Sequence, residues 1–267
     1  MYLGSSPSQL DALRQIRRSS YGAAFLAQTP FAQFWLRDLR AHAALALIMA
    51  RAAAATMSPA ALTRRGVSDL ASLSMSAVHS LLAEACTRGD FQRNADAGDR
   101  RRVMLMPAPD TAAAFAALVR EFAIAASGGA LHPAVAEEAA HEPQMLALYA
   151  RFASALVAVR RPGGRLWVQP ASLAVMADLM AARRDGVSPD SLRAAAARRG
   201  TDPVALDEDL GFAAMAGLAV AATDGRLRLS TEGRRCMLEH LELWRSWSSE
   251  ARLALATLAS PMSTRVA

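Results

Sequence analysis

Two neighbouring stretches of the chain determine the expected fold: LSMSAVHSLLAEACTRGDFQR at residues 73–93 and AGDRRRVMLMP at residues 97–107. In the first stretch, Ser74 is a favourable N-cap for a helix over residues 75–88. Its apolar residues recur at the spacing of one buried helical stripe: Val78, Leu81, Leu82 and Ala85. The following stretch, 91–106, has a turn-rich centre. The segments on either side can place successive residues on alternate faces of a strand, so the stretch predicts a β-hairpin.

The opposite face of the expected helix is small and polar. It consists of Ser76, His79, Ser80 and Ala83. Residues 67–71 would end a supporting helix and residues 72–74 would form a tight turn, so the order is helix, turn, helix and two-stranded wing. This is the winged helix-turn-helix arrangement, in which the second helix enters the major groove of DNA. Short hydrogen-bonding side chains approach base edges closely, although His79 also fits an incidental surface histidine.

The two stretches resemble the recognition helix and the wing of the MarR family of transcription regulators. The match covers roughly residues 58–126, and the acidic residue followed by arginines in the wing is its more distinctive part. The resemblance implies that Ser74, Ser76, His79 and Ser80 face the groove. It also implies two roles for Arg100, Arg101 and Arg102: some of them would contact phosphates or the minor groove, and another would form a structural ion pair with Asp99. The exposed face of this helix contains no Arg or Lys, and in this respect the sequence departs from the resemblance.

Several arginines around this unit are candidates for contact with the DNA backbone. Arg93 lies on the strand opposite Arg100–Arg102 and adds to the same patch, while Arg64 and Arg65 fall on the supporting helix. Arginine suits both phosphate oxygens and narrow minor grooves. For each of them, ordinary solvation of a surface charge is the competing interpretation.

The distribution of charge favours a polyanionic partner for the first half of the chain. The net charge is +6, and all 30 basic residues are arginine. Residues 1–130 hold 14 arginines against 9 acidic residues, a net of +5, whereas residues 131–267 hold 16 against 15, a net of +1. Apolar residues make up 53% of the chain and aromatic residues only 6%. Alanine therefore dominates the apolar content, which favours helices over sheet.

The second half of the chain repeats the plan of the first. Ser188-Pro189 corresponds to Ser58-Pro59, each an N-cap serine followed by proline in the first helical turn. A second hairpin is expected over 220–229 and a long helix over 231–258. The helix in the recognition position differs, because Asp207, Glu208 and Asp209 follow one another there. This copy is expected to serve packing or dimerisation, or to dock on a basic partner surface.

We therefore expect a mostly α fold with small β-hairpin wings, in which two winged helix-turn-helix units are packed by long helices. The expected segments are an N-terminal helical segment (1–28), a DNA-binding unit (29–126), a helical linker (127–160), a degenerate second unit (161–258) and a tail (259–267). Within them, one helix is expected from residue 31 to about 55, and another is expected to be capped by Asp110. The expected partner is double-stranded DNA, bound by a homodimer or by an internally pseudo-dimeric monomer.

Other classes of function have less support. The sequence shows no P-loop, dinucleotide-binding glycine pattern, nucleophile elbow or zinc-ligand spacing, so neither an enzyme nor a cofactor is expected. A small-molecule effector has no support in the sequence. Two cysteines and the lack of a signal peptide or a membrane-spanning stretch predict a cytoplasmic protein. Two alternatives remain: a tandem winged-helix protein-interaction module, and a replication initiator, against which the acidic run at 207–209 argues.

Overall fold

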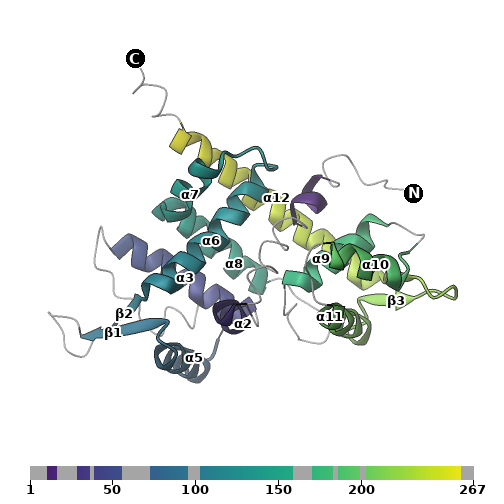
Figure 1. Cartoon of the computed structure of the whole chain (residues 1–267), viewed down its shortest axis with the longest axis horizontal. Helices are drawn as coiled ribbons and strands as arrows, with labels where there is room; N and C mark the ends of the chain where they lie inside the picture. The colour runs from purple at the N-terminus through teal and green to yellow at the C-terminus, as the bar shows by residue number, and fades with distance from the viewer. Residues whose placement is uncertain are drawn as a thin grey trace, which may run out of the picture. The chain divides into compact units, whose positions relative to one another are not determined.

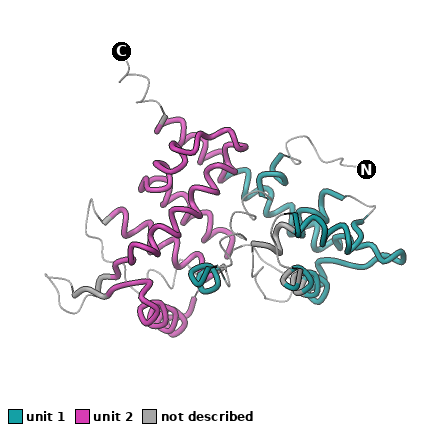
Figure 2. Tube along the Cα trace, viewed as in Figure 1, with its two compact units in different colours: residues 1–38, 159–246 teal, residues 39–158, 247–267 magenta. Residues whose placement is uncertain are grey.

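The computed structural model describes residues 11–16, 29–36, 39–55, 73–95, 103–158, 170–182, 186–198 and 203–259. These residues are mostly helical, with two small antiparallel hairpins, which confirms the expected fold class at this level. The chain divides into two compact units (Figure 2). Unit 1 comprises Met1–Asp38 and Val159–Ser246, and unit 2 comprises Leu39–Ala158 and Trp247–Ala267.

Unit 2 is a helical bundle with one hairpin (Figure 1). Its elements are α3 (Leu39–Ala55), α5 (Met75–Thr87), β1 (Phe91–Ala95), β2 (Val103–Pro107), α6 (Pro109–Ala126), α7 (Pro133–His141), α8 (Pro143–Ala158) and the end of α12 (Thr231–Ala259). The most extensive helix contact joins α3 to α8, and α7 packs on α6. The small side chains of Ala43, Ala44 and Ala46 on α3 are completely buried, which lets helices pack closely.

An aromatic cluster fills the centre of unit 2. The Phe122 ring meets Tyr149 and Trp247 edge-on, with centroids 5.0 and 5.7 Å apart. Phe115 and Phe152 also contact Tyr149, with ring centroids 5.6 and 6.5 Å from it. Such edge-to-face pairs add to the free energy gained by removing apolar surface from water. Tyr149 and Phe152, which fall within the expected helical linker 127–160, thus belong to the core of this unit.

Unit 1 contains the second hairpin. Its helices and strands are α2 (Pro30–Trp35), α9 (Pro170–Ala181), α10 (Pro189–Ala197), α11 (Pro203–Met215), β3 (Ala219–Ala221), β4 (Leu227–Leu229) and the first part of α12. The expected hairpin over 220–229 is confirmed, with Val220 opposite Arg228. Val187 adds a third segment, because it exchanges two backbone hydrogen bonds of 2.8 Å with Leu227.

Two local expectations about helices are wrong. Residues 31–55 do not form one helix, because α2 ends at Trp35 and Leu36 leaves the helical conformation with ψ at 4°. Apolar residues continue at helical spacing on both sides of this break, so the spacing of apolar residues does not predict it. Asp110 does not cap α6 either: the N-cap is Ala108, which makes no side-chain hydrogen bond, and Pro109 begins the helix. Asp110 instead lies in the first turn, where its carboxylate interacts favourably with the helix dipole.

No helix among the described residues is both long and apolar enough to cross a membrane.

Candidate nucleic-acid interface

Helix α5 begins and ends at residues whose local chemistry fixes its limits. Ser74 has extended backbone angles, and its Oγ accepts a hydrogen bond of 3.1 Å from the amide of Ala77. At the other end Gly89 has a φ of +82°, a conformation that a residue with a side chain rarely adopts. The amide of Asp90 then donates to the carbonyl of Ala85 at 2.9 Å. The expected cap and the start of the helix are therefore confirmed, and the helix ends at Thr87, one residue before the expected limit.

The two faces of α5 are separated as the sequence predicts. The buried residues of the helix are Val78, Leu81, Leu82 and Ala85. Ser76, His79 and Ser80 are all exposed. Because the apolar stripe is buried within unit 2, the polar face of the helix is presented to solvent.

The first two turns of α5 are the part best suited to contact base edges. Hydroxyl groups both donate and accept hydrogen bonds, and a neutral imidazole has one donor and one acceptor. In the last two turns, Thr87 Oγ1 already donates to the carbonyl of Ala83 at 3.0 Å, and Glu84 is an exposed acid. Glu84 would be repelled by phosphates, so an approach by DNA is favoured at the N-terminal end of the helix.

Two residues of this surface were missed by the sequence analysis. Met75 is 48% exposed at the start of α5, and Glu84 lies one turn beyond Ser80. Helical spacing places Glu84 on the polar face, so that signal was present in the sequence. The exposure of Met75 has no such signal, because an apolar residue in the first turn fits a buried position equally well.

The hairpin β1–β2 follows α5 directly and is anchored at its base. Phe91 is 2% exposed, and it pairs with Pro107 at the start of the register. The amide of Ala108 donates to the carbonyl of Asp90 at 2.9 Å, which closes the base. Helix α5 contacts β1, and α3 contacts β2. The hairpin is thus fixed to both the candidate recognition helix and the helical bundle.

The predicted basic residues fall largely beyond what the structure describes. Arg93 is placed by its backbone, opposite Leu105 in the hairpin. The others lie outside the described residues: Arg64, Arg65, Arg100, Arg101 and Arg102. At the base of the hairpin, Arg88 forms an ion pair of 3.2 Å with Asp90. The contacts expected of the basic wing remain predictions.

Unit 1 presents a different surface at the corresponding helix. Asp207 on α11 forms an ion pair of 3.1 Å with Arg193 on α10, and its side chain is 51% exposed. Val204 and Met215 on the same helix are 64% and 82% exposed. This surface combines acidic and apolar groups. Helix α5 also exposes an acid, Glu84, and an apolar residue, Met75, but its first two turns add hydroxyls and an imidazole without a carboxylate.

Two histidines of unit 2, His132 and His141, have partners close by in the sequence. His132 is the N-cap of α7, and its Nδ1 accepts a hydrogen bond of 3.3 Å from the amide of Ala134. His141 Nε2 lies 3.6 Å from a carboxylate oxygen of Glu137. Within the described ranges, no three His, Cys, Asp or Glu side chains are grouped as metal ligands would be.

The chain matches no protein-family model, no curated protein and no solved structure.

Proposed function

We propose that this chain is a sequence-specific DNA-binding transcription regulator of the winged helix-turn-helix class. In this proposal α5 enters the major groove, and the hairpin β1–β2 acts as the wing that contacts the DNA backbone. The order α5, β1, β2, α6 and the anchored base of the hairpin support this assignment.

The elements of unit 1 provide a second argument for the class. The chain passes through α9, the bridged segment at Val187, α10, α11 and the hairpin β3–β4. Helix, short strand, two helices and a two-stranded wing is the order of a complete winged helix. Because the sequence of unit 2 repeats the plan of unit 1, the same order is proposed there.

The single observation that carries the proposal is the composition of the exposed face of α5. Its first two turns present Ser76, His79 and Ser80 with no carboxylate among them. DNA repels acidic groups and attracts arginine, so the basic excess of residues 1–130 is consistent with this approach. The acidic α11 is not proposed to contact DNA; unit 1 would instead serve packing or dimerisation.

The assignment of α5 is tested by exchanging its exposed polar side chains. The variants Ser76→Ala and His79→Ala should change which base pairs are preferred, with a smaller effect on non-specific binding, because base contacts specify the sequence. The control is Gln144→Ala, an exposed polar residue of the same unit. A preference that is unchanged in both α5 variants, measured with a randomised DNA pool, would remove α5 from the recognition surface.

A second candidate function has one specific observation in its favour. The acidic and apolar surface of α11, with Val204 and Met215 exposed, suits a protein partner better than DNA. The chain would then be a tandem winged-helix interaction module without specific DNA binding. Negligible affinity for DNA at low salt would favour this alternative.

A further inference from the structure

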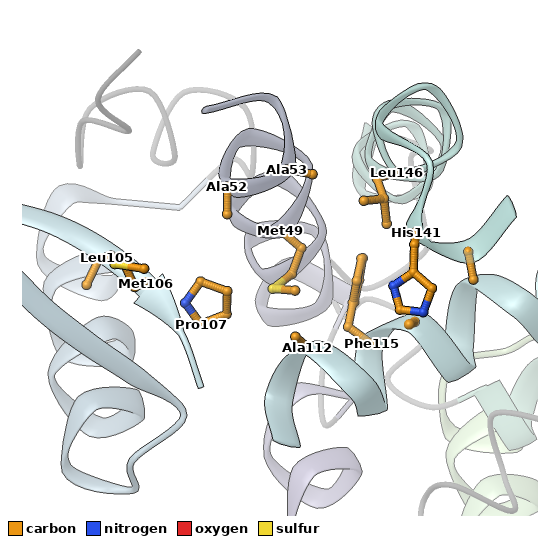
Figure 3. A pocket seen from close by; sticks show the side chains of 12 residues that line it. Met49, Ala52, Ala53, Leu105, Met106, Pro107, Ala112, Phe115, His141 and Leu146 are labelled. Atoms are coloured by element: carbon orange, nitrogen blue, oxygen red, sulfur yellow. The ribbon is translucent and has the colours of Figure 1, made fainter. Parts of the chain in front are cut away.

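Unit 2 contains a hollow of about 450 Å³ beside the hairpin (Figure 3). Its walls come from α3, β2, α6, α7 and α8. Met49, Phe115 and Leu146 are almost fully buried in it, whereas Met106 is 50% exposed. Ligand sites for small molecules are typically hollows of roughly 300–1,000 Å³ with mainly apolar walls. The volume and the apolar walls of this hollow fit a small molecule, and the hollow is open to solvent beside Met106 and His141, whose side chain is 63% exposed.

The chemistry of the walls indicates what kind of molecule fits. Apart from His141, the side chains of the described lining residues are those of alanine, leucine, methionine, phenylalanine and proline. The Glu137 carboxylate lies 3.6 Å from His141 Nε2, so the one polar side chain among the described lining residues already has a partner. The Arg120 guanidinium is itself engaged with Glu137 at 3.0 Å. Among the described residues no lysine or arginine lines the hollow, so these walls offer no counterion to offset the hydration that a bound anion would lose.

We infer that this hollow is a binding site for an uncharged, predominantly apolar small molecule. Such a ligand would contact Leu105 and Pro107 of β2 on one side and Ala112 and Phe115 of α6 on the other (Figure 3). Since β2 is one of the two strands of the hairpin, an occupied hollow would add a further contact between the hairpin and the bundle. The consequence for DNA affinity rests on the proposed function, whereas binding of the ligand does not.

The test uses the full chain and the neutral apolar fluorophore N-phenyl-1-naphthylamine, without DNA. Saturable fluorescence enhancement with one site per chain is expected. Ala112→Phe fills the hollow and should weaken binding at least tenfold. Ala113→Phe, its matched control on the exposed side of α6, should bind like the parent. Thermal unfolding followed by circular dichroism verifies that each variant is folded.

A second pair of variants keeps the test decisive if Ala112→Phe fails to fold. Ala52→Phe enters the same hollow from α3, and Ala54→Phe lies on the exposed side of that helix. The inference is overturned by non-saturable binding, by equal binding in a folded filling variant and its control, or by equally tight binding of the anionic analogue 8-anilinonaphthalene-1-sulfonate. Loss of DNA binding alone leaves these fluorescence results unchanged, so the two proposals fail separately.

Discussion

The Tyr149 hydroxyl lies 2.7 Å from Nε2 of His42, and this buried hydrogen bond joins α8 to α3. His42 is 7% exposed and Tyr149 is completely buried, with the two rings in edge-to-face contact. Burial lowers the pKa of His42 from 6.5 to about 4 and raises the pKa of Tyr149. Both groups are therefore neutral at pH 7, and the contact between the two main helices of unit 2 depends on an uncharged imidazole.

Acidification should destabilise unit 2 through His42. Its folded pKa lies below its unfolded value, so the unfolded chain binds the proton more tightly, and stability falls as pH drops from 6.5 to about 4. The expected contribution is a loss of about 2 kcal/mol between pH 7 and 4.5. Urea unfolding at both pH values measures it. His42→Gln should make the pH dependence shallower by that amount, and an equally steep dependence in the variant would contradict the assignment.

The N-cap of α5 should contribute to both stability and DNA binding. Ser74→Ala removes the bond to the amide of Ala77 and should cost about 1 kcal/mol. Ser74→Asp keeps a capping oxygen but adds a negative charge, so it should preserve stability and weaken DNA binding most at low salt. Ser188→Asp at the cap of α10 is the matched control and should leave DNA affinity unchanged. Equal affinities for Ser74→Asp and the parent chain would show that the start of α5 does not approach DNA.

The two hairpins should differ in their effect on DNA affinity. Replacing Arg100, Arg101 and Arg102 with alanine should weaken binding across all sequences and reduce the slope of log affinity against log salt. The reduction should be about 0.9 for each phosphate that the variant no longer neutralises. The control replaces Arg226 and Arg228 of the hairpin in unit 1, both of which are exposed. Fluorescence anisotropy at several salt concentrations measures the slopes, and equal slopes in the parent and the wing variant would remove the wing from the interface.

Glycine substitutions test how the second hairpin is seated. A Cβ on Gly233 would lie 2.0 Å from the backbone oxygen of Leu218, so Gly233→Ala forces the start of α12 away from the hairpin. The expected loss of stability is about 3 kcal/mol. Gly211 on α11 has open space instead, and Gly211→Ala should stabilise the helix by about 0.5–1 kcal/mol. Urea unfolding distinguishes them; a neutral Gly233→Ala would show that this packing is not as described.

The parts of the fold that the sequence predicts depend on local chemistry. The limits and buried stripe of α5 follow from a capping serine, helical spacing and a glycine at residue 89, all within one short segment. The turn of the second hairpin follows in the same way from Asp224 and Gly225, since Asp224 accepts a hydrogen bond from the amide of Arg226. The sequence did not predict the break at Leu36, because apolar residues continue on both sides of it. It also did not predict the start of α6, because Asp110 suits either an N-cap or the first turn of a helix.

The remaining features depend on residues far apart in the sequence. His42 and Tyr149 are 107 positions apart, and nothing in either neighbourhood predicts their contact. The hollow beside β2 likewise brings together residues from 49 to 146. The small alanine side chains in its lining leave space only once the helices are packed together, so the sequence alone does not reveal the hollow. For the candidate interface, the helix could be predicted from the sequence, but the exposure of Met75 could not.

The central claim, sequence-specific binding of DNA, is tested most directly by selection of fragmented genomic DNA with the purified full chain. The genome that encodes the chain supplies the fragments, and the retained DNA is sequenced. We predict enrichment of a few promoter regions that share a motif, and loss of that motif's enrichment in the Ser76→Ala, His79→Ala double variant. Absence of retention, or uniform retention that only salt abolishes, would contradict the claim.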